Sequence, residues 1–126
     1  MPQPIKVAII EDSSDLLYLY KSKFKKEGYD VKVAANGQEG LQLIKDWQPD
    51  IILLDILMPI MGGAEMLALV RAEEWGSDLR VIVLTNISKD EAPPIFRFLH
   101  VDRYVVKAHQ TPAQVVNIVQ EVLSER

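Results

Sequence analysis

Short apolar segments alternate with longer amphipathic ones five times along the chain. The apolar segments cover residues 5–10, 29–35, 51–54, 80–85 and 103–106. They are rich in valine, isoleucine and leucine, which is typical of β-strands. The third lies between Pro49 and Pro59 and consists only of large aliphatic residues. This pattern predicts a strand buried on both faces, in the middle of a parallel sheet.

The amphipathic segments predict helices over residues 15–27, 38–46, 64–74 and 112–123. Ser13 or Ser14 can cap the first helix, and Gly28 can end it. Thr111 can cap the last helix, with Pro112 at its first position. The first helix has a broad apolar face made of Leu16, Leu17, Leu19, Tyr20 and Phe24.

Residues 86–100 lack a regular pattern. Prolines are tolerated only at the start of a helix, so any helix here should begin near Pro93 and end by about Leu99. The alternation as a whole predicts an α/β fold, a doubly wound five-stranded parallel sheet with helices on both faces. With 126 residues and no linker, the chain should form a single domain over residues 1–126.

Composition removes several classes of function. There is no cysteine, which excludes disulfides, zinc–thiolate sites and thiol nucleophiles. No stretch resembles a signal peptide or is long enough to cross a membrane, so we expect a cytoplasmic protein that does not act at a membrane. The net charge of −4 argues against direct binding to nucleic acid.

Polar residues stand at the carboxyl ends of four of the predicted strands: Glu11, Asp12, Asp55, Thr85 and Lys107. In a parallel sheet they converge on one edge. Three carboxylates there repel one another and need a counter-charge, most plausibly Mg²⁺ with its preference for oxygen ligands. A lysine and a hydroxyl beside them suit phosphoryl oxygens. The set predicts a site that moves a phosphoryl group onto a carboxylate. Taken alone, Asp55 could equally end a strand and cap the next turn.

The chain resembles the receiver domains of bacterial two-component response regulators, whose fold is flavodoxin-like. The resemblance spans nearly the whole chain and is carried by an ordered set of motifs: VAIIED at 7–12, PDIILLD at 49–55, MPIMGG at 58–63, VIVLT at 81–85 and YVVK at 104–107. Each motif alone is weak, but the set in this order and spacing is specific.

The resemblance implies that Asp55 accepts a phosphoryl group from a histidine kinase or a phosphotransfer protein. It implies that Glu11, Asp12 and Asp55 hold Mg²⁺ together with the backbone carbonyl of Leu57. Such a chain is a signalling switch that catalyses only its own phosphorylation and dephosphorylation. It would act on a downstream protein target as a monomer or a weak homodimer.

The resemblance also implies roles for three further residues. Thr85 and Lys107 would bind the phosphoryl oxygens. Tyr104 would be an aromatic switch that turns inward when Thr85 moves.

Several positions depart from the family pattern. Ala108 stands where proline usually follows the lysine through a cis bond, and because a cis bond before a non-proline residue costs about 2.5–4 kcal/mol, we expect a trans bond. Gly62 replaces a residue that is usually acidic or an amide, and should loosen its loop. Asn86 replaces a small residue and could narrow access to Asp55. His100–Val101 replaces Gly-Ala, and together with the two prolines it changes the face through which the family usually signals.

Leu57 and Ile87 lie two residues beyond Asp55 and Thr85, positions that flank the path of attacking water in the family. Neither side chain can orient or deprotonate water, so we predict slow self-dephosphorylation.

Two other readings compete with a phosphorylated switch. A degenerate receiver could act as an interaction module without phosphorylation. The chain could also be an aspartate-based phosphatase or a flavin-binding protein, since both have a similar architecture. The phosphatase, however, would usually carry a second aspartate at Leu57, and Glu11 and Asp12 would repel a flavin phosphate.

Overall fold

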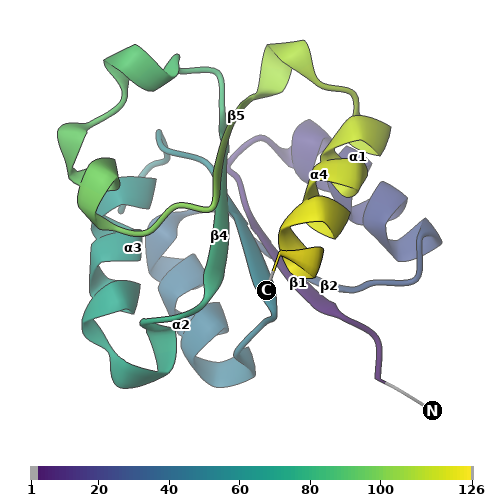
Figure 1. Cartoon of the computed structure of the whole chain (residues 1–126), viewed down its shortest axis with the longest axis horizontal. Helices are drawn as coiled ribbons and strands as arrows, with labels where there is room; N and C mark the ends of the chain where they lie inside the picture. The colour runs from purple at the N-terminus through teal and green to yellow at the C-terminus, as the bar shows by residue number, and fades with distance from the viewer. Residues whose placement is uncertain (1–2, 126) are drawn as a thin grey trace.

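The computed structural model describes residues 3–125 and contains one five-stranded parallel sheet (Figure 1). The strands are β1 (Lys6–Ile10), β2 (Asp30–Ala34), β3 (Ile51–Leu54), β4 (Arg80–Thr85) and β5 (Arg103–Val106). Their order in the sheet is β2-β1-β3-β4-β5, and every pair is parallel. The predicted doubly wound α/β fold is confirmed.

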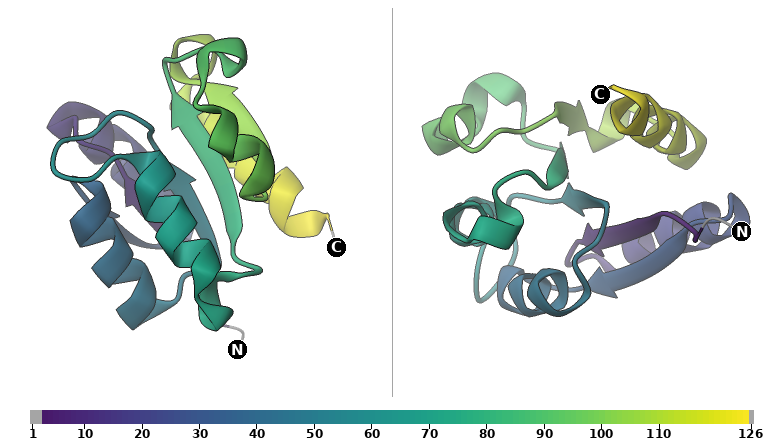
Figure 2. Two further views of the ribbon diagram at one scale, coloured as in Figure 1. Left: turned by 90° about the vertical axis from the view of Figure 1, so that its left-hand side faces the viewer. Right: turned by 60° about the horizontal axis from the view of Figure 1, so that its bottom comes forward.

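Four α-helices cover the two faces of this sheet. They are α1 (Ser14–Lys26), α2 (Gly37–Trp47), α3 (Gly63–Ala72) and α4 (Pro112–Ser124). Helices α1 and α4 lie side by side on one face, and α2 and α3 on the other (Figures 1 and 2). Within residues 3–125, none of the helices has the length and apolarity needed to cross a bilayer.

The two faces bury separate apolar clusters. Phe24 of α1 and Val119 of α4 pack against one face of the sheet, and Met66 and Leu67 of α3 against the other. All four residues of β3 are buried, as expected for a central strand covered on both sides. Burying one such side chain stabilises a fold by about 1.5–3 kcal/mol. The burial of β3 therefore fixes the position of Asp55, the residue that follows it.

Most predicted helix boundaries agree with the structure to within two residues. Ser13 caps α1 through its side chain, and Thr111 forms a reciprocal capping box with Gln114 at the start of α4. Asn36 caps α2 by accepting from the Glu39 amide. Leu19, placed on the inner face of α1, is half exposed.

The irregular segment contains two short 3₁₀ helices, η2 (Lys89–Glu91) and η3 (Pro94–Phe98), in place of an α-helix. The start near Pro93 and the end before Leu99 are as predicted. Proline is tolerated in the first turn of a helix, where its missing amide hydrogen would have no intrahelical acceptor, so the two prolines set where a helix can begin here. Phe96 and Leu99 are buried in the same cluster as α3.

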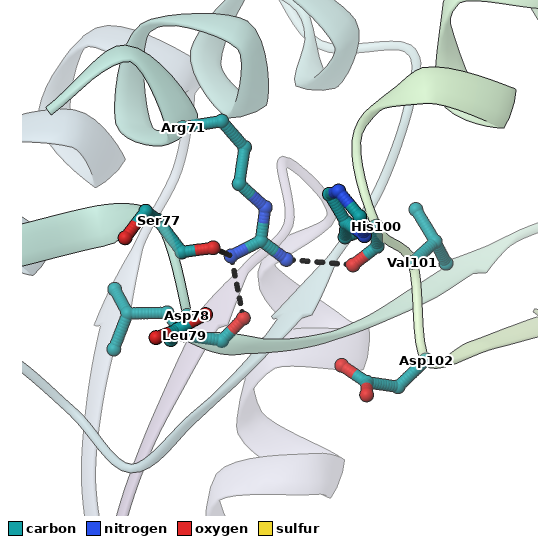
Figure 3. Close-up of a pocket in the computed structure, with 7 residues that line it drawn as sticks. All are labelled: Arg71, Ser77, Asp78, Leu79, His100, Val101 and Asp102. Atoms are coloured by element: carbon teal, nitrogen blue, oxygen red, sulfur yellow. Dashed lines mark hydrogen bonds between the residues drawn. The ribbon is translucent and has the colours of Figure 1, made fainter. Parts of the chain in front are cut away.

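Arg71 connects the end of α3 to this segment, a role that the sequence pattern did not predict. Its guanidinium donates to the carbonyls of Leu99 (2.8 Å), Gly76 (2.9 Å), Leu79 (2.6 Å) and His100 (2.7 Å). Figure 3 draws the bonds to Leu79 and His100, beside a cavity of about 220 Å³. His100 has a φ of 52°, a left-handed conformation that is uncommon for any residue except glycine. The arginine thus holds the turn that precedes β5.

Arg71→Met should destabilise the fold by about 2–4 kcal/mol, because several backbone carbonyls lose a charged donor. Chemical denaturation would measure the loss. Arg97→Met is the matched control, since Arg97 is exposed on η3, and it should change the free energy of unfolding by less than about 0.5 kcal/mol. Equal losses in the two variants would contradict a structural role for the Arg71 contacts.

Candidate functional site

The register of the strands brings the predicted site residues to one edge of the sheet. Ile10 pairs with Leu54, so Glu11 and Asp55 leave their strands at the same level. Thr85 pairs with Val106, which places Lys107 immediately beyond Thr85. The convergence that the sequence predicted is therefore a consequence of parallel pairing.

Asp55 is buried, and both oxygens of its carboxylate are bound. The Ile56 amide donates to Oδ1 (2.7 Å) and Lys107 Nζ donates to Oδ2 (2.8 Å). Gly63, the first residue of α3, lies so close that a Cβ there would be 2.1 Å from the Asp55 carbonyl oxygen. Any larger residue at position 63 would displace α3 or the backbone of Asp55.

Glu11 and Asp12 complete an acidic group with Asp55. One carboxylate oxygen from each of the three residues lies within 4.8 Å of the others. Glu11 is buried and accepts from the Ser13 amide (2.9 Å), whereas Asp12 is exposed. Burial raises the pKa of Glu11, although hydrogen bonds from Lys107 and Ser13 oppose this. Three clustered carboxylates, one of them open to water, are a donor set that fits Mg²⁺.

Lys107 joins the two buried carboxylates. Its Nζ also donates to Glu11 Oε1, and its side chain is 9% exposed. Burial by itself would lower the pKa of this amine, but the hydrogen bonds to Asp55 and Glu11 outweigh burial and raise the pKa. Lys107 is therefore positively charged at neutral pH and compensates charge at the site.

Thr85 and Tyr104 are both tied to the loop that follows β4. The buried Thr85 hydroxyl accepts a long hydrogen bond from the Ile87 amide (3.5 Å). The Tyr104 hydroxyl donates to the carbonyls of Ile87 (2.8 Å) and Ser88 (3.4 Å). One short loop thus connects the two residues expected to act as a switch, and the switching itself stays a prediction.

The residues expected to flank attacking water are apolar side chains at the rim of the site. Leu57 is 67% exposed, and Ile87 is half-buried. The role of the Leu57 carbonyl as a metal ligand stays a prediction.

The peptide bond between Lys107 and Ala108 is trans, as predicted, and no cis bond occurs within residues 3–125. The Ala108 amide donates to Asn86 Oδ1 (3.2 Å). Asn86 and Ala108, predicted as two separate departures from the family pattern, therefore contact each other. The pairing of Thr85 with Val106 at the ends of β4 and β5 brings the two residues together. Gly62 occupies the N-cap position of α3 and, because it has no side chain, makes no capping hydrogen bond.

Comparison with known proteins agrees with this geometry. The model of the response regulator receiver domain matches residues 7–120. The chain is similar to the structure of the chemotaxis response regulator CheY4 of Vibrio cholerae, with 25% identity, a TM-score of 0.87, and coverage of 95% of this chain and 99% of that one. It is also similar to a CheY-like response regulator receiver domain protein of Methanospirillum hungatei, with 26% identity, a TM-score of 0.87, and coverage of 98% and 96%.

Proposed function

The chain belongs to the response regulator receiver domain family, and on that premise we propose that it is a Mg²⁺-dependent switch phosphorylated on Asp55. The observation that carries the proposal is the contact of one lysine amine with two buried carboxylates, Glu11 and Asp55, inside the acidic group. A lysine whose only role was to end a strand would not be expected to contact both carboxylates.

In the proposed reaction, a carboxylate oxygen of Asp55 attacks the phosphorus of a phosphorylated histidine. The phosphorus–nitrogen bond breaks, and the imidazole leaves as a neutral ring that keeps the proton already on its other nitrogen. An acyl phosphate forms on Asp55. A carboxylate nucleophile needs no general base, because it carries no proton that must be removed before it attacks. Lys107 can move with the charge from the carboxylate to a phosphoryl oxygen. The Thr85 hydroxyl accepts from the Ile87 amide and can donate its own hydrogen to another phosphoryl oxygen.

Glu11, Asp12 and Asp55 are the residues that would hold Mg²⁺, with the Leu57 carbonyl as a predicted fourth ligand. The ion would supply positive charge against the phosphoryl oxygens as they approach the acidic group. Glu11 contributes to positioning as well, because it holds the Lys107 amine next to Asp55.

We place the output of the switch on the face formed by η2, η3 and β5. A groove of about 720 Å³ lies there, and Tyr104 contributes to its lining. Because the Tyr104 hydroxyl is bonded to the loop after Thr85, a shift of that loop towards a phosphoryl group would change the groove. The downstream partner is a protein. A cytoplasmic location and a monomeric or weakly dimeric state remain predictions.

Intact mass spectrometry after incubation with a small phosphodonor, such as phosphoramidate, tests the proposal. We expect one added phosphoryl group that requires both Mg²⁺ and Asp55, so Asp55→Asn should stay unmodified. Asp12→Asn, which lacks one of the proposed Mg²⁺ ligands, should be phosphorylated slowly, and added Mg²⁺ should raise its rate much less than that of the wild type. A folded wild-type chain that gains no phosphoryl group would favour the alternative function, an interaction module that works without phosphorylation.

A further inference from the structure

The chain leaves the sheet at Lys107. The last residue pair of β4 and β5 is Thr85 with Val106. Lys107 then enters a 3₁₀ turn, η4 (Lys107–His109), closed by the Gln110 amide on the Lys107 carbonyl (3.2 Å). The position of the Lys107 amine beside Asp55 depends on how this turn is seated.

Asn86 makes a hydrogen bond between the end of β4 and this turn. Its Oδ1 accepts from the Ala108 amide at 3.2 Å. A proline at position 108 would have no amide hydrogen to donate. With alanine, the amide exists and the bond extends the pairing of the two strands beyond Val106. The asparagine at 86 and the alanine at 108 are therefore chemically complementary.

We propose that Asn86 is a positioning residue that seats Lys107 against Asp55 through the Ala108 amide. This inference rests on the proposed phosphorylation of Asp55. It assigns to Asn86 the opposite effect from a side chain that merely narrows access to the site. If Asn86 obstructs the site, removing its side chain should speed phosphorylation. If Asn86 positions Lys107, removing its side chain should slow phosphorylation.

The sign of the rate change separates these two roles. Asn86→Ala and Asn86→Leu both remove the acceptor, but leucine keeps a side chain of similar size. We expect both variants to be phosphorylated by phosphoramidate about threefold to tenfold more slowly than the wild type, as for the loss of one hydrogen bond. Asn117→Ala, an exposed asparagine on α4, is the control and should leave the rate unchanged. A faster Asn86→Ala variant, or one equal to the control, would overturn the proposal.

A double-mutant cycle tests whether Asn86 acts through the Ala108 amide. In Ala108→Pro the donor is absent, so adding Asn86→Ala to that variant should change the rate by less than about twofold. An undiminished effect of Asn86→Ala in the proline background would overturn the proposal. Proline at 108 also disfavours a helical conformation at Lys107, so a measurement on the alanine chain is needed beside the cycle.

Hydrogen exchange at the Ala108 amide is that measurement, and it does not depend on phosphorylation. We expect exchange about threefold to tenfold faster in Asn86→Ala than in the wild type, with the Gln110 amide less affected. Unchanged exchange at Ala108 would overturn the proposed contact, whatever the rates. A wild-type chain that shows the contact by exchange but accepts no phosphoryl group would overturn the proposed function of the chain and, with it, this role of Asn86.

Discussion

Lys107→Met is expected to slow the Mg²⁺-dependent phosphorylation of Asp55 by about a hundredfold or more. The Lys107 amine is the positive charge that contacts Asp55 Oδ2, at 2.8 Å, and methionine keeps the length of the side chain without the charge. Removing one positioned electrostatic donor from a reaction of this kind costs about 10²–10³-fold in rate. Time-resolved intact mass spectrometry with phosphoramidate would measure the rate.

The ratio of the wild-type phosphorylation rate to that of Lys107→Met should be constant between about pH 7 and pH 9. The pKa of Lys107 is raised above 10.5, so the wild-type amine stays charged across this range. The charged amine stabilises the folded site below the pKa that this lysine has in the unfolded chain. That stabilisation is lost only as the pH rises through the higher pKa of the lysine in the folded chain. A deficit that disappeared between neutral pH and about pH 9 would show that the reacting lysine is neutral, contrary to this geometry.

Lys89→Met is the matched control for this variant, since Lys89 is exposed on η2 and should not affect the rate. Circular dichroism and denaturation would establish that Lys107→Met folds, because the variant leaves Glu11 and Asp55 without their shared counter-charge. Phosphorylation of folded Lys107→Met at the wild-type rate would refute the role given to the lysine.

The phosphorylated wild-type chain is expected to persist for many minutes, and Leu57→Asn should shorten that lifetime by about tenfold or more. The exposed Leu57 side chain cannot orient water, whereas an amide at this position can. Positioned acid–base groups contribute about 10²–10⁴-fold, and an amide that only orients water should give a smaller gain. The decay of the phosphorylated mass after removal of the phosphodonor gives both lifetimes.

Ile60→Asn is the control for the lifetime experiment. Ile60 is 75% exposed in the same loop, and its φ of 70° suits asparagine. This variant should leave the lifetime unchanged. Loss of the phosphoryl group from the wild type within seconds would rule out the slow-hydrolysis prediction.

Much of the site could be predicted because its residues directly follow strands. Once the apolar segments around Ile10, Leu54, Thr85 and Val106 are recognised as parallel strands, the polar residues after them must share one edge. The periodicity of the sequence therefore determined the fold, the acidic group and the placement of Lys107. The limits of the short helix after Pro93 followed equally from the chemistry of proline, whereas its 3₁₀ form was not predicted.

Other features depended on contacts that only the folded chain creates. Arg71 lies on an ordinary amphipathic helix, and its carbonyl partners are separated from it by up to 29 residues. Asn86 and Ala108 are 22 residues apart, and nothing local relates them. Local periodicity and capping determine strands and helices because those depend on neighbours along the chain. Side-chain contacts between loops depend on distances across the sheet, which only the tertiary structure decides.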